Sequence, residues 1–425
     1  MQRSLRCTLF AVAALLFASS VPAAEFAIVQ PADAGMSAER LQRLDEAQSA
    51  YVANGQLAGQ VTLVLRDSRV VYSKADGWRD QAAGAAMTHD TIFRIASQSK
   101  AIVSTAIMIL HERGQLNIGH PLSRYFPEWT DVQVAVDDGA GGYTLEPARQ
   151  PITLRMLLTH TAGVGYGYGL AQDRWEQAGL TGWYFADKEE PIGASVARMG
   201  ALPIVAQPGE QWVYGYSTDI LGAVVEKASG TDLATFLRTE IFAPLDMRDT
   251  HFYLPRGKAE RLAVVYRPRE GGGIEAIPEA NGMQSQGLYV EGSGPNVSFS
   301  GGAGLLSTAR DYARLLQMFL NGGDLDGRRI LSPKTVELMT VDHLGDIMFR
   351  PGQGFGLGSS VVEDLGARGA LGSVGEYGWG GAYHSVYWVD PAERLVVVYM
   401  TQLIPAAGLD DQDTLRSGVY QAIVD

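Results

Sequence analysis

A serine and a lysine three positions apart are the residues of this chain best suited to covalent chemistry. Ser97 and Lys100 begin an apolar run that continues to Leu110 with helical spacing, so their side chains are expected on one helix face. A serine hydroxyl becomes a nucleophile when a nearby group takes its proton, and a buried lysine or a phenolate can do so. The N-terminal end of a helix also favours developing negative charge. The pair therefore fits acyl transfer, but S-x-x-K also arises by chance as a solvated serine and lysine at a helix start.

Further segments of the sequence, taken together, resemble one known superfamily. In chain order they are FRIASQSK at 93–100, LLTHTAG at 157–163, PGEQWVY at 208–214, DILG at 219–222, SGGAGL at 300–305 followed by ST and DY, and GWGG at 378–381. On these motifs the chain is identified as a member of the serine β-lactamase and penicillin-binding superfamily. It resembles class C β-lactamases and, more closely, the family VIII carboxylesterases, over about residues 36–423.

The resemblance implies a tyrosine as general base beside the serine and the lysine. In the family the second motif supplies this tyrosine, and it matches Tyr214, which gives Ser97, Lys100 and Tyr214 as the catalytic set. Tyr216 is the rival. The usual Y-x-N is Tyr214-Gly215-Tyr216 here, so the asparagine that often orients the lysine is missing. We expect Tyr216 to pack or to line the substrate pocket rather than to act as a base, because aromatic side chains more often fill space.

The third motif departs further from the β-lactamase pattern. Where β-lactamases carry Lys-Thr-Gly, this chain has Trp379-Gly380-Gly381, which we expect to contact substrate. The change removes the cation that would hold a β-lactam carboxylate and supplies an apolar wall, which favours neutral esters. The alternative is that Trp379 merely caps the core. By analogy with the family, the backbone N–H groups of Ser97 and Ala382 would form the oxyanion hole.

The elements that must position these residues lie at both ends of the chain. Ser37 is a suitable N-cap for a helix that ends near Gly55, and a closing amphipathic helix is predicted around 415–423. Two hairpins are predicted, one with strands at 61–65 and 70–73, the other at 384–389 and 395–401. Further helices are predicted at 219–229, 233–241 and 309–321.

The fold class follows from this arrangement together with the resemblance. We expect an α/β fold of the α+β type, in which an antiparallel sheet is flanked by helices and a helical domain is inserted, as in serine β-lactamases and DD-peptidases. Residues 25–115 and 300–425 are expected to form the α/β domain and 116–299 the mainly helical insert, with the site between them. A length of 425 residues accommodates two such units.

Residues 1–24 have the pattern of a secretory signal peptide. Arg3 and Arg6 precede an apolar run from Cys7 to about Ala18, and small residues follow up to Ala24. The run is shorter than the roughly 20 residues of a spanning helix, so we expect cleavage rather than an uncleaved anchor. The prediction is an exported protein, periplasmic or secreted, without stable membrane insertion. Because Cys7 is the only cysteine, no disulfide is expected after cleavage.

Other functions are disfavoured by charge and by missing motifs. A net charge of −13 would repel nucleic acid and anionic membranes. No H-x-x-x-H pair is present, and His111 lacks the second histidine of H-E-x-x-H, so we expect no metal and no cofactor. His160 on a Thr-Gly loop is more typical of a structural residue than of a base. The glycine runs at 163–169 and 271–273 are interpreted as turns, and no G-x-S-x-G indicates an α/β-hydrolase.

The leading functional hypothesis is hydrolysis of carboxylic esters through an acyl-Ser97 intermediate that water then attacks. A class C type β-lactamase and a D-amino-acid amidase or peptidase are alternatives that share the nucleophile. A third alternative is a penicillin-binding-like sensor that is acylated without turnover. The expected partner is a small-molecule ester or amide. The acyl chain, the alcohol, the acceptor and the oligomeric state stay open.

Overall fold

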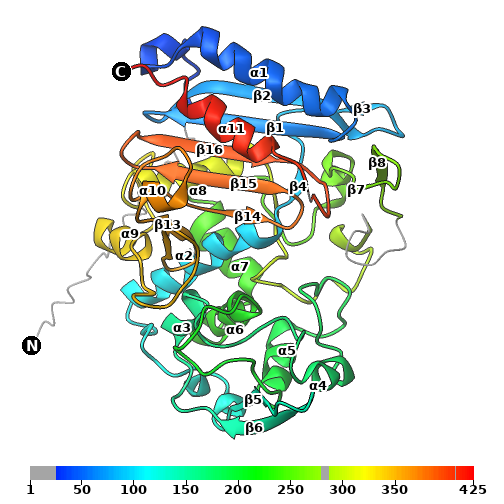
Figure 1. The fold of residues 1–425 in the computed structure, drawn as a ribbon, viewed down its shortest axis with the longest axis vertical. Coiled ribbons are helices and arrows are strands. Elements are labelled where there is room, and N and C mark those ends of the chain that lie inside the picture. The colour runs from blue at the N-terminus through cyan, green and yellow to red at the C-terminus, as the bar shows by residue number, and fades with distance from the viewer. Residues whose placement is uncertain (1–24, 279–286, 407) are drawn as a thin grey trace, which may run out of the picture.

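The computed structural model describes residues 25–278, 287–406 and 408–425. The predicted signal peptide at 1–24 lies outside these residues. The main feature is an antiparallel sheet of eight strands, in which strands from the two ends of the chain are neighbours (Figure 1). In sheet order the strands are β12 Gln353–Phe355, β13 Ser360–Val362, β14 Tyr377–Gly381, β15 Ser385–Asp390, β16 Leu395–Met400, β1 Gly59–Arg66, β2 Arg69–Asp80 and β3 Ala85–Ala86.

Both predicted hairpins are present in this sheet. Strands β1 and β2 are joined by Asp67 and Ser68, which have φ values of 53° and 60°. Two consecutive residues with positive φ give the tight turn whose twist matches that of paired strands. Strands β15 and β16 form the second hairpin, and β16 also pairs with β1, with Val64 opposite Val397. The last strand of the chain thus lies beside its first.

The sheet is covered on both faces, and β16 shows how one strand serves two cores. All its residues are buried; Val397 and Tyr399 face one cluster, whereas Val398 faces the other. The first cluster includes residues of α1 Ala38–Ala53 and α11 Asp411–Tyr420, which lie side by side over the sheet (Figure 1). The predicted cap is confirmed, since Ser37 Oγ accepts the Arg40 N–H at 3.3 Å.

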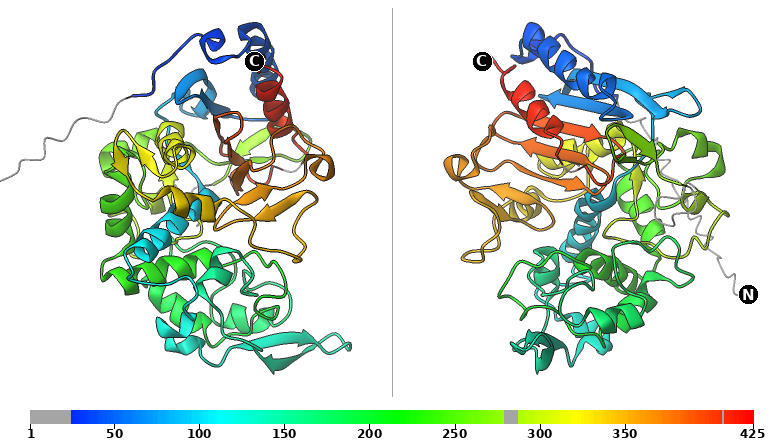
Figure 2. Two further views of the ribbon diagram at one scale, coloured as in Figure 1. Left: turned by 90° about the vertical axis from the view of Figure 1, so that its left-hand side faces the viewer. Right: turned by 45° about the vertical axis from the view of Figure 1, so that its right-hand side comes forward.

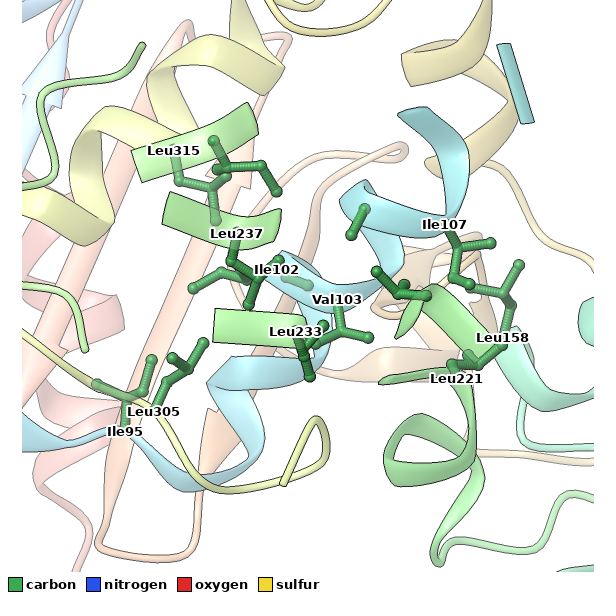
Figure 3. Close-up of a cluster of buried hydrophobic side chains, with 14 of the residues drawn as sticks. Ile95, Ile102, Val103, Ile107, Leu158, Leu221, Leu233, Leu237, Leu305 and Leu315 are labelled. Carbon is green, nitrogen blue, oxygen red and sulfur yellow. The ribbon is translucent and has the colours of Figure 1, made fainter. Parts of the chain in front are cut away.

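The central helix α2, Ser99–Glu112, forms the core on the opposite face. It is buried on all sides from Ser99 to Leu110, as expected for a helix that is apolar around its whole circumference. Its helical partners include α6 Ser217–Ser229 and α7 Leu233–Leu237, while α8 Ala309–Leu320 packs directly on the sheet. Figure 3 shows Ile102 and Val103 of α2 among Leu233 and Leu237 of α7. The predicted helix 233–241 is shorter than expected, because Arg238–Phe242 turns as a π-helix.

A mainly helical region occupies the end of the molecule that lies opposite α1 (Figures 1 and 2). The predicted fold class is confirmed: an antiparallel sheet is flanked by helices, with helical elements between its two halves in sequence. The exact domain boundaries stay a prediction. Among the described residues, no helix combines the length and apolarity that crossing a membrane requires. The remaining elements are α3 Leu154–Leu158, α4 Gln172–Gln177, α5 Ile192–Met199, α9 Pro333–Met339, α10 Leu365–Arg368, β4 Phe93–Arg94, β5 Gln133–Asp137, β6 Tyr143–Pro147, β7 Tyr266–Pro268, β8 Ile274–Ala276, β9 Leu306–Ser307, β10 Asp324–Leu325 and β11 Arg328–Arg329.

Candidate active site

Ser97 lies in a tight turn that leads directly into α2. The turn is a single 3₁₀ segment, Ala96–Gln98, so the serine precedes the first α-helical residue instead of lying within the helix. Ala96 has a φ of 42°, a left-handed conformation that is unfavourable for a residue with a Cβ atom. Such strain persists only where surrounding contacts impose it. Here Ile95 N–H donates to the Leu305 carbonyl at 3.1 Å, and both side chains are seen together in Figure 3.

Lys100 is fully buried and donates to three oxygen atoms. Its Nζ lies 3.2 Å from Ser97 Oγ, 3.3 Å from the Tyr166 hydroxyl and 2.8 Å from the Gly302 carbonyl. An ammonium group has three donors, so these contacts use its full capacity. None of the three acceptors is a carboxylate. The lysine is therefore held by hydrogen bonds, with one of its N–H bonds directed at the nucleophile.

The loop that carries Gly302 is fixed by a buried carboxylate. Asp219 Oδ1 accepts the Gly302 N–H at 3.0 Å and the Ser300 hydroxyl at 2.6 Å. Burial raises the pKa of Asp219, whereas these hydrogen bonds and the Lys100 charge oppose that effect. The segments 219–222 and 300–305 both carried the family resemblance. Together they hold the Gly302 carbonyl in the position where it accepts a hydrogen bond from Lys100.

Tyr214 stands beside the lysine and the predicted substrate wall. Lys100 Nζ lies 4.6 Å from the centroid of the Tyr214 ring, and Trp379 Nε1 donates to the Tyr214 hydroxyl at 3.1 Å. The tyrosine belongs to an aromatic cluster with ring centroids 4.8 Å from His160 and 5.5 Å from Trp212. The structure therefore brings Ser97, Lys100, Tyr214 and Trp379 together, as the sequence predicted, although the four come from distant segments.

A cavity of about 580 Å³ opens onto Ser97. Its lining includes Tyr214, Trp379, Gly380 and Ala382, so both residues expected to form the oxyanion hole face the same space. A larger cavity, of about 730 Å³, is lined by Arg238, Phe252 and Phe299 among others and contains none of the predicted site residues. The chemistry of the side chains, not the size of the cavity, identifies the smaller one as the candidate active site.

Comparisons with known proteins agree with this geometry. A family model described as Beta-lactamase matches residues 44–418. The chain belongs to this beta-lactamase family. Esterase EstB from Burkholderia gladioli is 33% identical over 374 residues, which cover 84% of this chain and 89% of that protein. Lovastatin esterase from Penicillium rubens is 28% identical and covers 89% of this chain and 98% of its own length.

A solved structure with a similar fold is that of EstCE1, described as a hydrolase with promiscuous acyltransferase activity. It superimposes with a TM-score of 0.76 and 27% identity, covering 90% of this chain and 99% of its own. The predicted resemblance to esterase-like members of the serine β-lactamase superfamily is confirmed, and with it the prediction of a serine hydrolase.

Tyr166 also lies in the candidate active site, although it was not among the residues predicted from the sequence. Its hydroxyl contacts Lys100 Nζ, and its ring lies edge-on to Tyr214 with centroids 5.7 Å apart. Burial raises its pKa well above the usual value, and the neighbouring Tyr214 and Asp219 raise it further. Tyr166 lies in the glycine run interpreted only as turns. The signal that was present is a tyrosine three residues after the LLTHTAG motif.

Tyr216 occupies a packing position, which corrects the expectation that it contacts substrate. The side chain is fully buried and its ring stacks on Trp175 with centroids 5.7 Å apart. Its hydroxyl donates to the Leu180 carbonyl at 2.8 Å and also contacts the Gly182 carbonyl. It does not line the cavity at Ser97. Both tyrosines lie just before α6, but their side chains point in different directions. Of the two, only Tyr214 reaches the cavity.

His160 is a buried member of the aromatic cluster. The backbone N–H of His160 donates to the Leu157 carbonyl. The backbone carbonyl of His160 accepts the Val213 N–H at 2.8 Å, which connects the LLTHTAG loop to the second motif. Burial lowers its pKa well below the usual value, and the nearby Lys100 charge adds to this effect. A neutral, tightly packed imidazole fits the structural interpretation. In the described part of the chain, no group of three or more His, Cys, Asp or Glu side chains could hold a metal ion.

Gly381 permits the close approach of β14 to the nucleophile segment. A Cβ atom at this position would lie 2.5 Å from the Ile95 carbonyl oxygen and closer still to Ser385 Oγ. We expect Gly381→Ala to displace β14 from Ser97 and to lower kcat about 100-fold, because a shift of about 1 Å in an active site has that effect. Steady-state hydrolysis of p-nitrophenyl butyrate measures the change.

The matched control is Gly193→Ala, in α5. There the new Cβ atom would lie 3.9 Å from its nearest neighbour, Glu226 Oε2, in a helix where alanine is favoured over glycine. This variant is expected to keep wild-type activity. Equal kcat values for the two variants would show that the contact between Gly381 and Ile95 does not position the site.

Proposed function

We propose that this protein hydrolyses carboxylic esters by acylation and deacylation of Ser97. The observation that carries the proposal is the contact of Lys100 Nζ with Ser97 Oγ, in a cavity whose wall contains Trp379 in place of a lysine. Relatives named as esterases support the same reaction class. The buried, hydrogen-bonded lysine distinguishes this pair from an accidental S-x-x-K, in which both side chains would be solvated.

In the proposed reaction, Tyr214 takes the proton of Ser97 as the serine oxygen attacks the ester carbonyl. Tyr214 enters this step as a phenolate, which the Lys100 ammonium above its ring stabilises, and becomes a neutral phenol when it takes the proton. The backbone N–H groups of Ser97 and Ala382 hold the oxyanion. The carbon–oxygen bond of the ester then breaks, and the leaving alkoxide receives the proton from Tyr214. The product of this half-reaction is acyl-Ser97 and a free alcohol.

Water then completes the cycle in a second acyl transfer, in which acyl-Ser97 is the acyl donor and Ser97 is the leaving group. It attacks the acyl-Ser97 carbonyl while Tyr214 takes one of its protons, and that proton returns to Ser97 as the acid departs. An alcohol that replaced water would give acyl transfer, a reaction named for EstCE1. We also propose that the chain is exported, to the periplasm or beyond, on the basis of the signal pattern in residues 1–24.

Replacement of the nucleophile tests the reaction directly. Ser97→Ala is expected to abolish hydrolysis of p-nitrophenyl butyrate without loss of the folded state, as judged by circular dichroism. The reason is that Ser97 is the serine that Lys100 contacts, whereas the Ser360 hydroxyl on the cavity wall donates to the Gly378 carbonyl. The wild type is to be assayed beside it with nitrocefin and a D-alanyl-D-alanine peptide. Ester turnover well above both supports the proposal. Retained ester hydrolysis by Ser97→Ala, or faster cleavage of nitrocefin or peptide by the wild type, would contradict it.

The three tyrosines are expected to respond differently to replacement by phenylalanine. Tyr214→Phe should lower kcat by about 10²- to 10⁴-fold, the usual contribution of a general base. Tyr166→Phe should have a smaller effect, because burial raises the pKa of the Tyr166 hydroxyl and so disfavours the phenolate that a general base requires. Tyr216→Phe should instead lower the free energy of unfolding by about 1–3 kcal/mol, since the buried Leu180 carbonyl loses its donor.

The measurements are pH-dependent ester kinetics and urea unfolding on all three variants. If Tyr166→Phe lost more activity than Tyr214→Phe, the base would be Tyr166. If Tyr216→Phe lost kcat and kept full stability, its assignment as a packing residue would be wrong.

A further inference from the structure

Arg350 places a positive charge on the wall of the Ser97 cavity, on the loop between α9 and β12. Its guanidinium carbon lies 5.1 Å from the centroid of the Trp379 ring and 4.9 Å from that of Phe349. Stacking on two aromatic rings holds a guanidinium by its face and leaves the N–H donors on its edge available. The third motif lacks the lysine that β-lactamases carry there, and Arg350 supplies a cation to this cavity from a different loop.

The other two arginines that line this cavity share one carboxylate. Arg368 and Arg416 donate to the two oxygens of Glu376, at 2.9 Å and 2.8 Å, and that carboxylate is only 2% exposed. Arg350 differs, because it forms no ion pair with any of the residues that the structure describes. An arginine keeps its charge at physiological pH, so this edge of the cavity presents an uncompensated cation.

Acidic residues outnumber basic ones, 47 to 34, so carboxylates are abundant, yet none reaches Arg350 in the described structure. The residue is solvent-accessible at the cavity wall, where an incoming ligand can meet it. A planar guanidinium with free edge donors matches the two oxygens of a carboxylate. The missing partner is consistent with an anion supplied by the substrate.

We propose that the Ser97 cavity selects esters that carry a carboxylate, and that Arg350 binds this group. The proposal rests on the proposed ester hydrolysis at Ser97 and specifies its substrate class. It also replaces the expectation that Trp379 makes the site selective for neutral esters. Trp379 in this arrangement is the surface on which the cation is held.

Two pairs of substrates test the proposal, and each pair differs mainly in charge. Mono-p-nitrophenyl glutarate carries a carboxylate on the acyl side, and p-nitrophenyl butyrate lacks it. The second pair, 4-acetoxybenzoate and 4-acetoxybenzamide, does so on the alcohol side. The quantity compared is the ratio of kcat/KM for the anionic ester to kcat/KM for the neutral ester. Because each ratio is measured on one protein preparation, a loss of active enzyme cancels.

The variants are Arg350→Gln, Arg350→Lys and, as a matched control, Arg328→Gln. Arg328 is exposed on β11 and does not line the cavity, so this control removes the same charge elsewhere. For at least one pair we expect Arg350→Gln to lower the ratio about 10-fold or more, the effect of losing a hydrogen bond between charged groups. Arg350→Lys should restore part of the ratio, and Arg328→Gln should leave it unchanged. Added salt should lower the wild-type ratio.

The pair that responds identifies the half of the ester that carries the carboxylate. Equal ratios for wild type and Arg350→Gln in both pairs would overturn the proposal, and so would an equal fall in Arg328→Gln. Failure of the proposed ester hydrolysis is distinguishable, because then the wild type would cleave none of the four esters, or Ser97→Ala would cleave them as fast.

Discussion

The buried ammonium of Lys100 is the interaction around which the site is organised. A charge without access to water must be surrounded by polar atoms, and no carboxylate in the described part of the chain forms an ion pair with it. The required oxygens come from Ser97 in the turn before α2, from the Gly302 loop and from Tyr166. Three segments, with Lys100 and Gly302 separated by 202 positions, must therefore meet at one nitrogen atom. Their meeting point is also where the nucleophile lies, so folding and catalysis impose the same constraint.

The sheet supplies the other side of the site. Strand β14 pairs with β15, and β16 and β1 continue the sheet to the opposite end of the chain. The absence of a side chain at Gly381 lets β14 approach the Ile95 carbonyl, directly before the nucleophile turn. Trp379, two residues earlier on the same strand, then reaches the Tyr214 hydroxyl. The order of strands is thus the reason that residues 97, 214 and 379 share one cavity.

Sequence patterns predicted the elements whose signals are local. The Ser37 cap and the two hairpins depend on neighbouring residues, and each prediction is confirmed. The closing helix was predicted around 415–423 but ends at Tyr420, since helix ends depend on tertiary contacts that the pattern does not contain. The motifs of the superfamily predicted that Ser97, Lys100 and Tyr214 lie together, because each motif has a known place in the fold of that superfamily.

Side-chain direction and loop placement could not be predicted in the same way. Tyr214 and Tyr216 are two positions apart in the sequence, but Tyr214 lines the cavity whereas Tyr216 donates to the buried Leu180 carbonyl. Tyr166 lies among glycines, where the sequence indicates a turn but not which residues the turn approaches. Arg350 lies in a loop that no motif covers, and only the fold brings it to Trp379. In each case the information lies in contacts between distant segments.

The most direct test of the central claim is to label the protein with a fluorophosphonate probe and to map the modified residue by tandem mass spectrometry. Cleavage after Arg94 and Lys100 gives a peptide that contains both Ser97 and Ser99, so fragmentation must distinguish them. Ser99 Oγ is buried and accepts the Leu305 N–H at 3.1 Å. The predicted result is one phosphonyl group per chain, on Ser97. Modification of Ser99 or of a residue outside this peptide, or an unlabelled protein that still cleaves esters, would contradict the account.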